Sequence, residues 1–273
     1  MDRAEDQAAR YDRIADGYAR WWAPVIAPAA LDLLDRLAGP LAVATDVVDI
    51  GTGTLALAAV GRWPHLRIVG VDASAEMAAR AAAEADAQLA DEARQRVQTI
   101  VAPADRTTLG AASADVVVSS FVYQLVPNRH RALVEARRLL RPGGTIGYVT
   151  WLRGGPASAA DAAVDEVLER FGFDPREPDP DPGDLASPEA AAAGLRRAGF
   201  RAAHAEAGLL DHRWGPAEIV GFLEHFDETS TFEALEPDQR PELRDALLER
   251  LTSLSVDELA LRLPIVYATA LTG

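Results

Sequence analysis

The chain contains no cysteine and no lysine, so its basic residues are all arginine. The absence of cysteine excludes disulfides, thiolate metal sites and cysteine nucleophiles. The absence of lysine excludes Schiff-base chemistry and the phosphate-binding lysine of a P-loop. No apolar run approaches the roughly 20 residues that span a bilayer. Residues 1–22 mix both signs of charge and predict no export signal, so we expect a cytoplasmic protein without a membrane partner.

The chain is strongly acidic, with a formal net charge of −15 and a sequence pI of about 4.7. An acidic surface repels nucleic-acid phosphates and anionic lipid, so we expect no nucleic acid among the partners. The densest basic stretch, residues 129–141, is typical of the solvated face and carboxyl end of a helix. The five histidines show no metal-ligand spacing, so we expect no metal. A small-molecule substrate remains, bound by a monomer or a homodimer.

Hydrophobic patterning predicts an α/β fold. Continuous apolar runs rich in valine and isoleucine are typical of parallel strands buried on both faces, and they alternate with helical segments such as 74–96 and 128–140. This alternation predicts a doubly wound sheet. Serine caps are expected at Ser74 and Ser187, and Gly199 ends the helix after Ser187. The expected strands are 43–51, 67–72, 97–102, 114–121, 145–151, 201–208 and 264–271.

We expect one domain over residues 1–273. A helical cap (1–42) precedes the cofactor-binding half (43–152). Residues 153–263 hold helical insertions and the sixth strand, which together would form a lid over the substrate, and 264–273 hold the last strand. Within this part, 174–188 form a loop rich in proline and aspartate, and 216–259 are mostly amphipathic helix.

The stretch "VVDIGTGTLALA" (47–58) is typical of a nucleotide-binding turn between a strand and a helix. Gly51 and Gly53 would let the backbone approach a ligand, and Asp72 ends the next strand nineteen residues later, where a carboxylate can accept ribose hydroxyls. The pattern G-x-G-x-x-A with Asp72 also fits an NAD(P)-dependent oxidoreductase. Asp49 argues against a pyrophosphate and for a positively charged ligand, although it could instead simply cap backbone amides of the turn.

Five segments together resemble the class I S-adenosylmethionine-dependent methyltransferases, in the small-molecule-modifying group (methyltransferase type 11 or UbiE-like). They are "YDRIADGYARWW", "VVDIGTGT", "VDASAEM", "ADVVVSSFVYQL" and "EARRLLRPGGTIGYV". The resemblance implies a Rossmann-like seven-stranded sheet of order 3-2-1-4-5-7-6, with the last strand antiparallel. It implies S-adenosyl-L-methionine as cofactor and S-adenosyl-L-homocysteine as product.

The resemblance also assigns roles to individual residues. Asp49 would face the ammonium group of the cofactor, Asp72 would hold the ribose, and Ser119 would approach the methionine part through its backbone. The chain departs from the family at Leu55, in place of a third glycine, and at Pro103, in place of an acid that contacts the adenine. The implied cofactor residues are Tyr11, Tyr18, Asp49, Gly51, Gly53, Asp72, Ala73, Met77, Ala104, Asp105 and Ser119.

Methyl transfer is an in-line displacement that needs a positioned acceptor and the exclusion of water, and it needs a base only for some acceptors. We therefore expect no conspicuous catalytic residue, and the candidates are His212, His225 and Tyr123. An aromatic wall favours an aromatic or apolar organic acceptor. The expected substrate residues are Trp21, Trp22, Tyr123, Gln124, Trp151, Trp214, Phe222 and Phe226.

Two other functions stay open from the sequence. One is an NAD(P)-dependent oxidoreductase, which only the glycine pattern and Asp72 support. The other is an enzyme of the same fold that binds the cofactor without transferring its methyl group.

Overall fold

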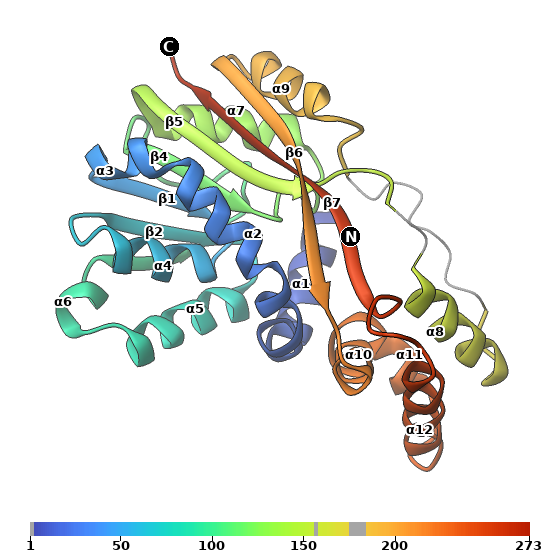
Figure 1. Cartoon of the computed structure of the whole chain (residues 1–273). Coiled ribbons are helices and arrows are strands. Elements are labelled where there is room, and N and C mark those ends of the chain that lie inside the picture. The colour runs from blue at the N-terminus through green and yellow to red at the C-terminus, as the bar shows by residue number, and fades with distance from the viewer. Residues whose placement is uncertain (1–2, 156–157, 175–183) are drawn as a thin grey trace.

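The computed structural model describes residues 3–155, 158–174 and 184–273 (Figure 1). Helices precede the sheet, as the sequence predicts: α1 (Arg3–Gly17), the π-helical segment η1 (Tyr18–Trp22), α2 (Ala23–Arg36) and α3 (Ala38–Val43). A π-helical turn inside a helix often marks a functional site. The predicted loop at 174–188 lies mostly outside the described residues.

A seven-stranded sheet forms the centre of the molecule, in the order β3-β2-β1-β4-β5-β7-β6. Strands β1 to β5 are parallel, and β7 is antiparallel to both β5 and β6. The predicted fold and strand order are therefore confirmed. The strands are β1 (Asp46–Ile50), β2 (Arg67–Asp72), β3 (Val97–Val101), β4 (Ala114–Ser120), β5 (Leu140–Trp151), β6 (Arg201–Arg213) and β7 (Ala260–Leu271).

Helices cover both faces of this sheet (Figure 1). One hydrophobic core joins α2 and α4 (Thr54–Arg62) to one face, and a second joins α7 (Arg129–Leu139) and α9 (Pro188–Arg197) to the other. The predicted helix 74–96 is divided into α5 (Ala75–Gln88) and α6 (Asp91–Arg94), because Leu89 and Ala90 have extended backbone. The caps at Ser74 and Ser187 are confirmed, since each side chain accepts a hydrogen bond from a backbone amide of the first turn.

The last two strands are longer than the sequence predicts. β6 continues to Arg213 and β7 begins at Ala260, and the two pair with each other beyond Trp151, where β5 ends. This correction moves His212, which the sequence placed in a helical insertion, onto a strand. Alternating exposure along β6 explains the error, because a half-exposed ribbon lacks the continuous apolar run of a central strand.

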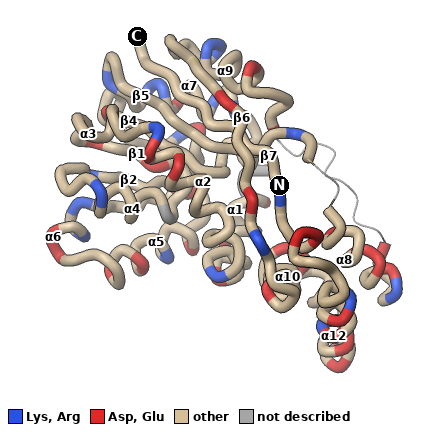
Figure 2. The backbone as a smooth tube through the Cα atoms, in the orientation of Figure 1, with Lys and Arg blue, Asp and Glu red and all other residues tan. Residues whose placement is uncertain are grey.

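The remaining helices gather at the far end of the β6–β7 ribbon (Figure 1). Acidic residues and arginines both occur along α12 (Gln239–Thr252), as the colours in Figure 2 show. No helix among the described residues has the length and apolar character needed to cross a membrane. These elements are α8 (Ala159–Arg170), α10 (Pro216–Phe222), the π-helical η2 (Leu223–Asp227), α11 (Thr229–Ala234) and α12 (Gln239–Thr252).

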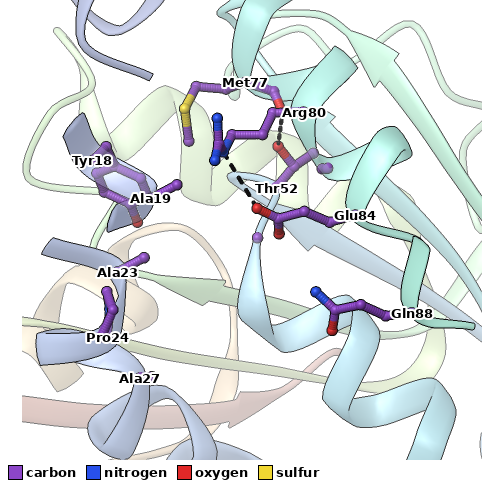
Figure 3. Close-up of a pocket in the computed structure, with 12 residues that line it drawn as sticks. Tyr18, Ala19, Ala23, Pro24, Ala27, Thr52, Met77, Arg80, Glu84 and Gln88 are labelled. Atoms are coloured by element: carbon purple, nitrogen blue, oxygen red, sulfur yellow. Dashed lines mark hydrogen bonds and ion pairs between the residues drawn. The ribbon is translucent and has the colours of Figure 1, made fainter. Parts of the chain in front are cut away.

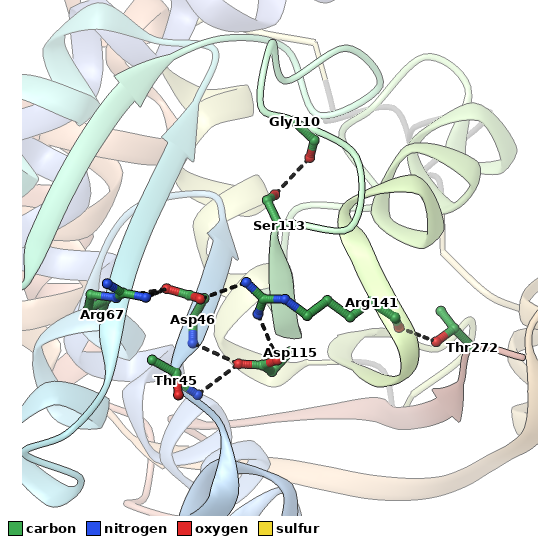
Figure 4. Close-up of polar contacts among 8 residues, drawn as sticks. All are labelled: Thr45, Asp46, Arg67, Gly110, Ser113, Asp115, Arg141 and Thr272. Atoms are coloured by element: carbon green, nitrogen blue, oxygen red, sulfur yellow. Dashed lines mark hydrogen bonds and ion pairs between the residues drawn. The ribbon is translucent and has the colours of Figure 1, made fainter.

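A charged cluster joins the amino ends of the central strands (Figure 4). The Asp115 carboxylate accepts the backbone amides of Thr45 and Asp46 at 2.8 and 2.9 Å. Arg141 donates to Asp115 at 2.7 Å and to Asp46 at 2.8 Å, and Arg67 also pairs with Asp46. These bonds fix β1, β4 and β5 at the sheet edge opposite the glycine turn, and the carboxyl ends remain for a site.

Candidate functional site

The glycine turn joins β1 to α4 at the carboxyl end of the sheet. Gly51 has φ +87°, a left-handed conformation that favours glycine. A Cβ there would lie 2.1 Å from Cγ2 of Val122, in the segment after β4. The amide of Gly51 donates to the carbonyl of Val71 at 2.7 Å. Glycine at position 51 is therefore required by the neighbouring Val122 as well as by the backbone, a reason that the sequence alone does not show.

Asp72 at the end of β2 fixes the shape of this turn. Its Oδ2 accepts the amide of Thr52 at 3.1 Å and the Thr52 hydroxyl at 3.3 Å, and its Oδ1 accepts the amide of Ser74 at 2.8 Å. Burial raises the pKa of Asp72, and the bonds from Ser74 and Thr52 oppose this change. The carboxylate thus connects the first turn to the start of α5, and its remaining lone pairs can accept further hydroxyl groups.

Asp49 in β1 is fully buried, and among the described residues neither of its carboxylate oxygens has a hydrogen bond partner of good geometry. Burial raises its pKa well above the ordinary value, the negative charge of Asp72 adds to this, and the amide of Ala56 offsets only part of it. A buried carboxylate without a partner is costly in a folded protein. The group is therefore suited to a cationic ligand that is not part of the chain.

Tyr123 lies next to this carboxylate. It is 1% exposed, its hydroxyl has no partner among the described residues, and its ring meets Tyr148 edge-on with centroids 5.2 Å apart. Burial raises the pKa of Tyr123, and the charges of Tyr148 and Asp49 raise it further. The hydroxyl therefore stays protonated at neutral pH. The Ser120 hydroxyl, three residues earlier, is also buried, and the part of the chain that the structure describes gives it no partner.

The N-terminal helix covers the ribose side of the site. Tyr11 and Tyr18 meet edge-on at 5.9 Å, and burial raises the pKa of Tyr11 to about 12, a change partly opposed by Arg10 and increased by Asp72. Asp12 accepts the Ser74 hydroxyl at 2.5 Å and the amide of Glu76 at 3.2 Å. The predicted positions of Tyr11 and Tyr18 thus lie beside Asp72, on a helix attached to the start of α5.

A cavity of about 220 Å³ opens between η1 and α2 on one side and α5 on the other. Tyr18 of η1 and Met77 of α5 face each other across it, and Thr52 and Gly53 of the turn also line it (Figure 3). Arg80 lies on its α5 side and pairs with Glu84 at 3.3 Å and with Asp16 of α1. The structure thus brings three predicted cofactor residues, Tyr18, Gly53 and Met77, to one cavity.

Two predicted cofactor residues lie on the loop after β3. Asp105 forms an ion pair with Arg131 of α7 at 3.5 Å, and Ala104 precedes it on a partly buried loop. Ala73 directly follows Asp72, whose side chain curls back to the Ser74 amide. The Ser119 hydroxyl donates to the carbonyl of Ile50 at 2.9 Å, so its side chain bonds to β1.

Aromatic side chains from four parts of the chain form one cluster beside the ends of β4 and β5. Phe121 has φ +54° and lies 4.1 Å from Trp151 between ring centroids. Trp22 of η1 contacts Trp151 at 6.0 Å. We call this set the aromatic cluster, and its members are Tyr18, Trp22, Phe121, Trp151, Trp214, Phe222 and Phe226.

Two predicted substrate residues have other surroundings. Trp21 stacks on His225 at 6.4 Å, and its indole Nε1 is buried without a partner among the described residues. Both ends of the Gln124 amide are in use: Nε2 donates to the carbonyl of Phe121 at 2.6 Å, and Oε1 accepts from Thr150 at 2.7 Å. Gln124 therefore supports the backbone of Phe121 at the edge of the aromatic cluster.

The two candidate histidines lie on different elements. His212 in β6 meets Trp214 edge-on at 4.7 Å, beside the aromatic cluster. The His225 side chain is 53% exposed, and its Nε2 lies 3.9 Å from Glu224. No group of three or more histidine, aspartate or glutamate side chains that could hold a metal occurs within residues 3–155, 158–174 and 184–273.

Sequence reasoning missed several residues that shape the site. Asp12 and Val122 gave no signal, because their partners are distant in sequence. Glu135 did give one: it lies on the apolar face of helix 129–139 with Ala132 and Leu139. A carboxylate on such a face needs a buried partner.

The sheet order, the glycine turn and the strand-end carboxylate together define the fold of the class I methyltransferases. Residues 48–147 match the family described as methyltransferase domain. The resemblance predicted from the motifs, to the class I S-adenosylmethionine-dependent methyltransferases, is therefore confirmed, and the family match covers residues 48–147.

Known proteins agree with this assignment. Over 121 residues the chain is 42% identical to trans-aconitate 2-methyltransferase from Azoarcus sp. (strain BH72), a match that spans 43% of each protein. Among solved structures it resembles the YcgJ protein of Bacillus subtilis, with 19% identity, a TM-score of 0.58, and coverage of 90% of this chain and 98% of that one.

A second solved structure is phosphoethanolamine N-methyltransferase 2 of Haemonchus contortus, bound to phosphomonomethylethanolamine and S-adenosylhomocysteine. The two chains are 18% identical, with a TM-score of 0.53 and coverage of 90% of this chain and 52% of that one. At these identities the solved structures support the fold. The comparisons do not favour an NAD(P)-dependent oxidoreductase.

Proposed function

We propose that this protein is an S-adenosylmethionine-dependent methyltransferase that acts on a small organic acceptor. The observation that carries the proposal is the buried carboxylate of Asp49 beside the glycine turn, to which the described residues supply no hydrogen bond of good geometry. A dinucleotide would bring a negative pyrophosphate to this turn, and Asp49 would repel it. A ligand with an ammonium group beside a nucleoside supplies the cation that Asp49 lacks and the hydroxyls that Asp72 can accept.

The residues present fit S-adenosylmethionine. Asp49 would face its ammonium group, Asp72 its ribose hydroxyls, and Met77 would pack on its adenine. Tyr18 would enclose it from η1, where an aromatic ring near a sulfonium is favourable by about 1 kcal/mol. When bound, the cofactor supplies an electrophilic methyl group. The family match over residues 48–147 supports the same assignment.

The aromatic cluster supports an aromatic or apolar acceptor. Trp22, Trp151 and Phe222 are each partly exposed, so their rings form an apolar wall that a ligand can reach. Such walls bind organic ligands mainly by burying apolar surface, and a few polar groups fix the orientation. The curated relative is named for trans-aconitate, another small molecule, which supports a small rather than a macromolecular acceptor. We place the acceptor between this wall and the turn.

Catalysis in this proposal rests on positioning and the exclusion of water. The chain holds the acceptor against Trp151 and Tyr123 while η1 and η2 cover the site. The Tyr123 hydroxyl, whose pKa is raised by burial, acts as a donor and not as a base. Of the two candidate histidines, His212 is the better base for an acidic acceptor proton, because it adjoins the aromatic cluster through Trp214.

Methyl transfer is tested with S-adenosylmethionine carrying a radiolabelled methyl group and a panel of small acceptors. The proposal predicts label on at least one aromatic or apolar acceptor and its loss in Asp72→Asn. Calorimetric titration with S-adenosylhomocysteine and with NAD complements this assay. Tight binding of NAD without binding of S-adenosylhomocysteine would overturn the proposal, and tight S-adenosylhomocysteine binding with no label on any acceptor would favour an enzyme that does not transfer the methyl group.

A further inference from the structure

The loop after β3 runs from the ribose side of the candidate site to helix α7. It begins at Ala102, whose amide donates to the carbonyl of Asp72 at 2.8 Å. It then turns, with the amide of Arg106 bonded to the carbonyl of Pro103 at 3.0 Å. Residues 103–109 form what we call the β3 loop, and it carries Ala104 and Asp105, two of the expected cofactor residues.

Glu135 of α7 holds this loop through a buried carboxylate. Its Oε1 accepts the amide of Thr107 at 2.9 Å and the Thr107 hydroxyl at 2.7 Å. Thr107 is fully buried, and the Glu135 side chain is only 10% exposed. Hydrogen bonds to a charged acceptor are stronger than neutral ones, and buried ones are costly to lose.

Arg138 completes the attachment on the same face of α7. Its Nε donates to Oε2 of Glu135 at 2.6 Å, and its Nη2 donates both to Oε1 of Glu135 at 2.7 Å and to the carbonyl of Leu109 at 2.8 Å. The arginine thus neutralises the carboxylate and fixes the end of the β3 loop. A third tie, the ion pair of Asp105 with Arg131, comes from the preceding turns of α7.

The loop backbone needs this support. Thr108 has φ +64°, an unfavourable conformation for a β-branched residue. Such strain persists only where the surroundings impose it. Glu135 accepts hydrogen bonds from both the amide and the hydroxyl of Thr107, the residue before Thr108. Without these bonds the loop would relax toward conformations with negative φ at Thr108.

We propose that Glu135 is a positioning residue for cofactor recognition: by holding Thr107, it sets the β3 loop in the conformation that reads the amino edge of the adenine. This inference rests on the proposed function, since it takes the cofactor to be an adenosyl compound. Pro103 offers no side-chain acceptor for the adenine amine, so recognition passes to the loop backbone and to Asp105. Both are rigid only as far as α7 holds them.

The test compares two ligands that differ at that edge, S-adenosylhomocysteine and S-inosylhomocysteine, in which a carbonyl replaces the adenine amine. Calorimetry gives the dissociation constant of each for the wild type, Glu135→Gln and Thr107→Val. Val134→Ala is the matched control, because Val134 is an exposed neighbour on α7. Amide hydrogen exchange over residues 103–109 is measured on the same proteins without ligand.

We expect the wild type to prefer S-adenosylhomocysteine, and we expect this preference to fall by about tenfold in Glu135→Gln, because the charge-assisted hydrogen bonds that hold Thr107 are weakened. Thr107→Val keeps the hydrogen bond from its backbone amide to Glu135, so its preference for S-adenosylhomocysteine should fall less. Val134→Ala should leave the preference unchanged. Exchange in the β3 loop should accelerate in Glu135→Gln. Partial restoration of the preference in Glu135→Asp would also support the proposal.

Other outcomes overturn it. If Glu135→Gln lowers thermal stability or weakens both ligands equally while the preference stays, Glu135 is only structural. If the wild type binds S-adenosylhomocysteine with no preference over the inosyl compound, the β3 loop does not read the adenine. If the wild type binds neither ligand, the proposed function itself fails, and faster exchange in Glu135→Gln would then show only that α7 holds the loop.

Discussion

The indole ring of Trp21 lies directly against the backbone of Gly221: a Cβ built on Gly221 would lie 2.4 Å from both Cζ2 and Cη2 of the ring. A few residues away, a Cβ on Gly17 would lie 1.7 Å from the carbonyl oxygen of His225. Gly17 at the end of α1 and Gly221 of α10 therefore let the α1–η1 segment and the α10–η2 segment pack in close contact.

Gly221→Ala should separate these two segments. The added methyl group overlaps the Trp21 ring, and overpacking of this kind costs about 1–3 kcal/mol. For a chain of this size we expect a melting temperature lower by about 2–4 °C per kcal/mol. Thermal unfolding followed by tryptophan fluorescence measures it. Gly61→Ala is the control, because none of the described residues lies within 4 Å of a Cβ built there and alanine favours the helix. Equal melting temperatures for the two variants would contradict the contact between Gly221 and Trp21.

Asp49→Asn should stabilise the ligand-free protein and weaken cofactor binding. Burial raises the pKa of Asp49, so the folded protein binds its proton more tightly than the unfolded chain does. Stability is therefore lost as the pH rises from the ordinary carboxyl pKa toward the raised one. The advantage of asparagine should grow with pH over this range, to about 1 kcal/mol or more.

Calorimetric titration completes the test of Asp49. We expect Asp49→Asn to bind S-adenosylhomocysteine at least about tenfold more weakly, since a charge-assisted contact to the ammonium group is lost. Wild-type binding should also weaken as the pH falls, because the ammonium group must displace the proton of Asp49. Undiminished affinity in Asp49→Asn would assign this carboxylate to the turn and not to the ligand.

Glu135 should give the opposite dependence of stability on pH. The hydrogen bond from Arg138, followed by those from Thr107, lowers the pKa of Glu135 to about 2. An acid with a lowered folded pKa contributes stability that is complete above its ordinary pKa and is lost as the pH falls toward the folded one. We compare the free energies of unfolding of the wild type and Glu135→Gln, measured with urea at pH 7 and at pH 3.5. The difference between the two proteins should be smaller at pH 3.5. A gap that does not change with pH would mean that the charge of Glu135 contributes nothing.

Thr150→Val should destabilise the protein without weakening cofactor binding. The change leaves Oε1 of Gln124 buried without its donor, at a cost of about 1–3 kcal/mol. The Thr150 hydroxyl bonds to Gln124, which holds the backbone of Phe121, and Gln124 is not one of the expected cofactor residues. The affinity for S-adenosylhomocysteine should therefore stay within about twofold. Thr252→Val, at an exposed hydroxyl, is the control and should change stability by less than about 0.5 kcal/mol. A loss of affinity in Thr150→Val would place Thr150 nearer the cofactor than we infer.

The sequence predicts the sheet well because its central strands β1, β4 and β5 are mostly buried on both faces and read as continuous apolar runs. It predicts the turn and Asp72 because their spacing follows from one strand–helix–strand unit. The extended ribbon of β6 and β7 escapes prediction, since its half-exposed residues lack that pattern. The role of Gln124 also escapes prediction, because a polar residue beside a strand end indicates a ligand. Only the tertiary structure shows that Phe121 and Thr150 occupy both ends of its amide.

Side chains that meet across long sequence separations are the least predictable part of the site. Val122 against Gly51 and Asp12 on Ser74 each join segments that only the fold brings together. Tertiary packing also decides that Trp21 faces His225 while its neighbour Trp22 joins the aromatic cluster. Nothing in the two adjacent letters distinguishes them.

A crystal structure of the protein with S-adenosylhomocysteine tests the central claim most directly. We predict a ribose whose hydroxyls bond to the Asp72 carboxylate, an amino group facing Asp49, and space between the sulfur and Trp151 for an acceptor. A crevice filled by the protein's own side chains, or the nucleoside bound away from Asp49 and Asp72, would contradict it.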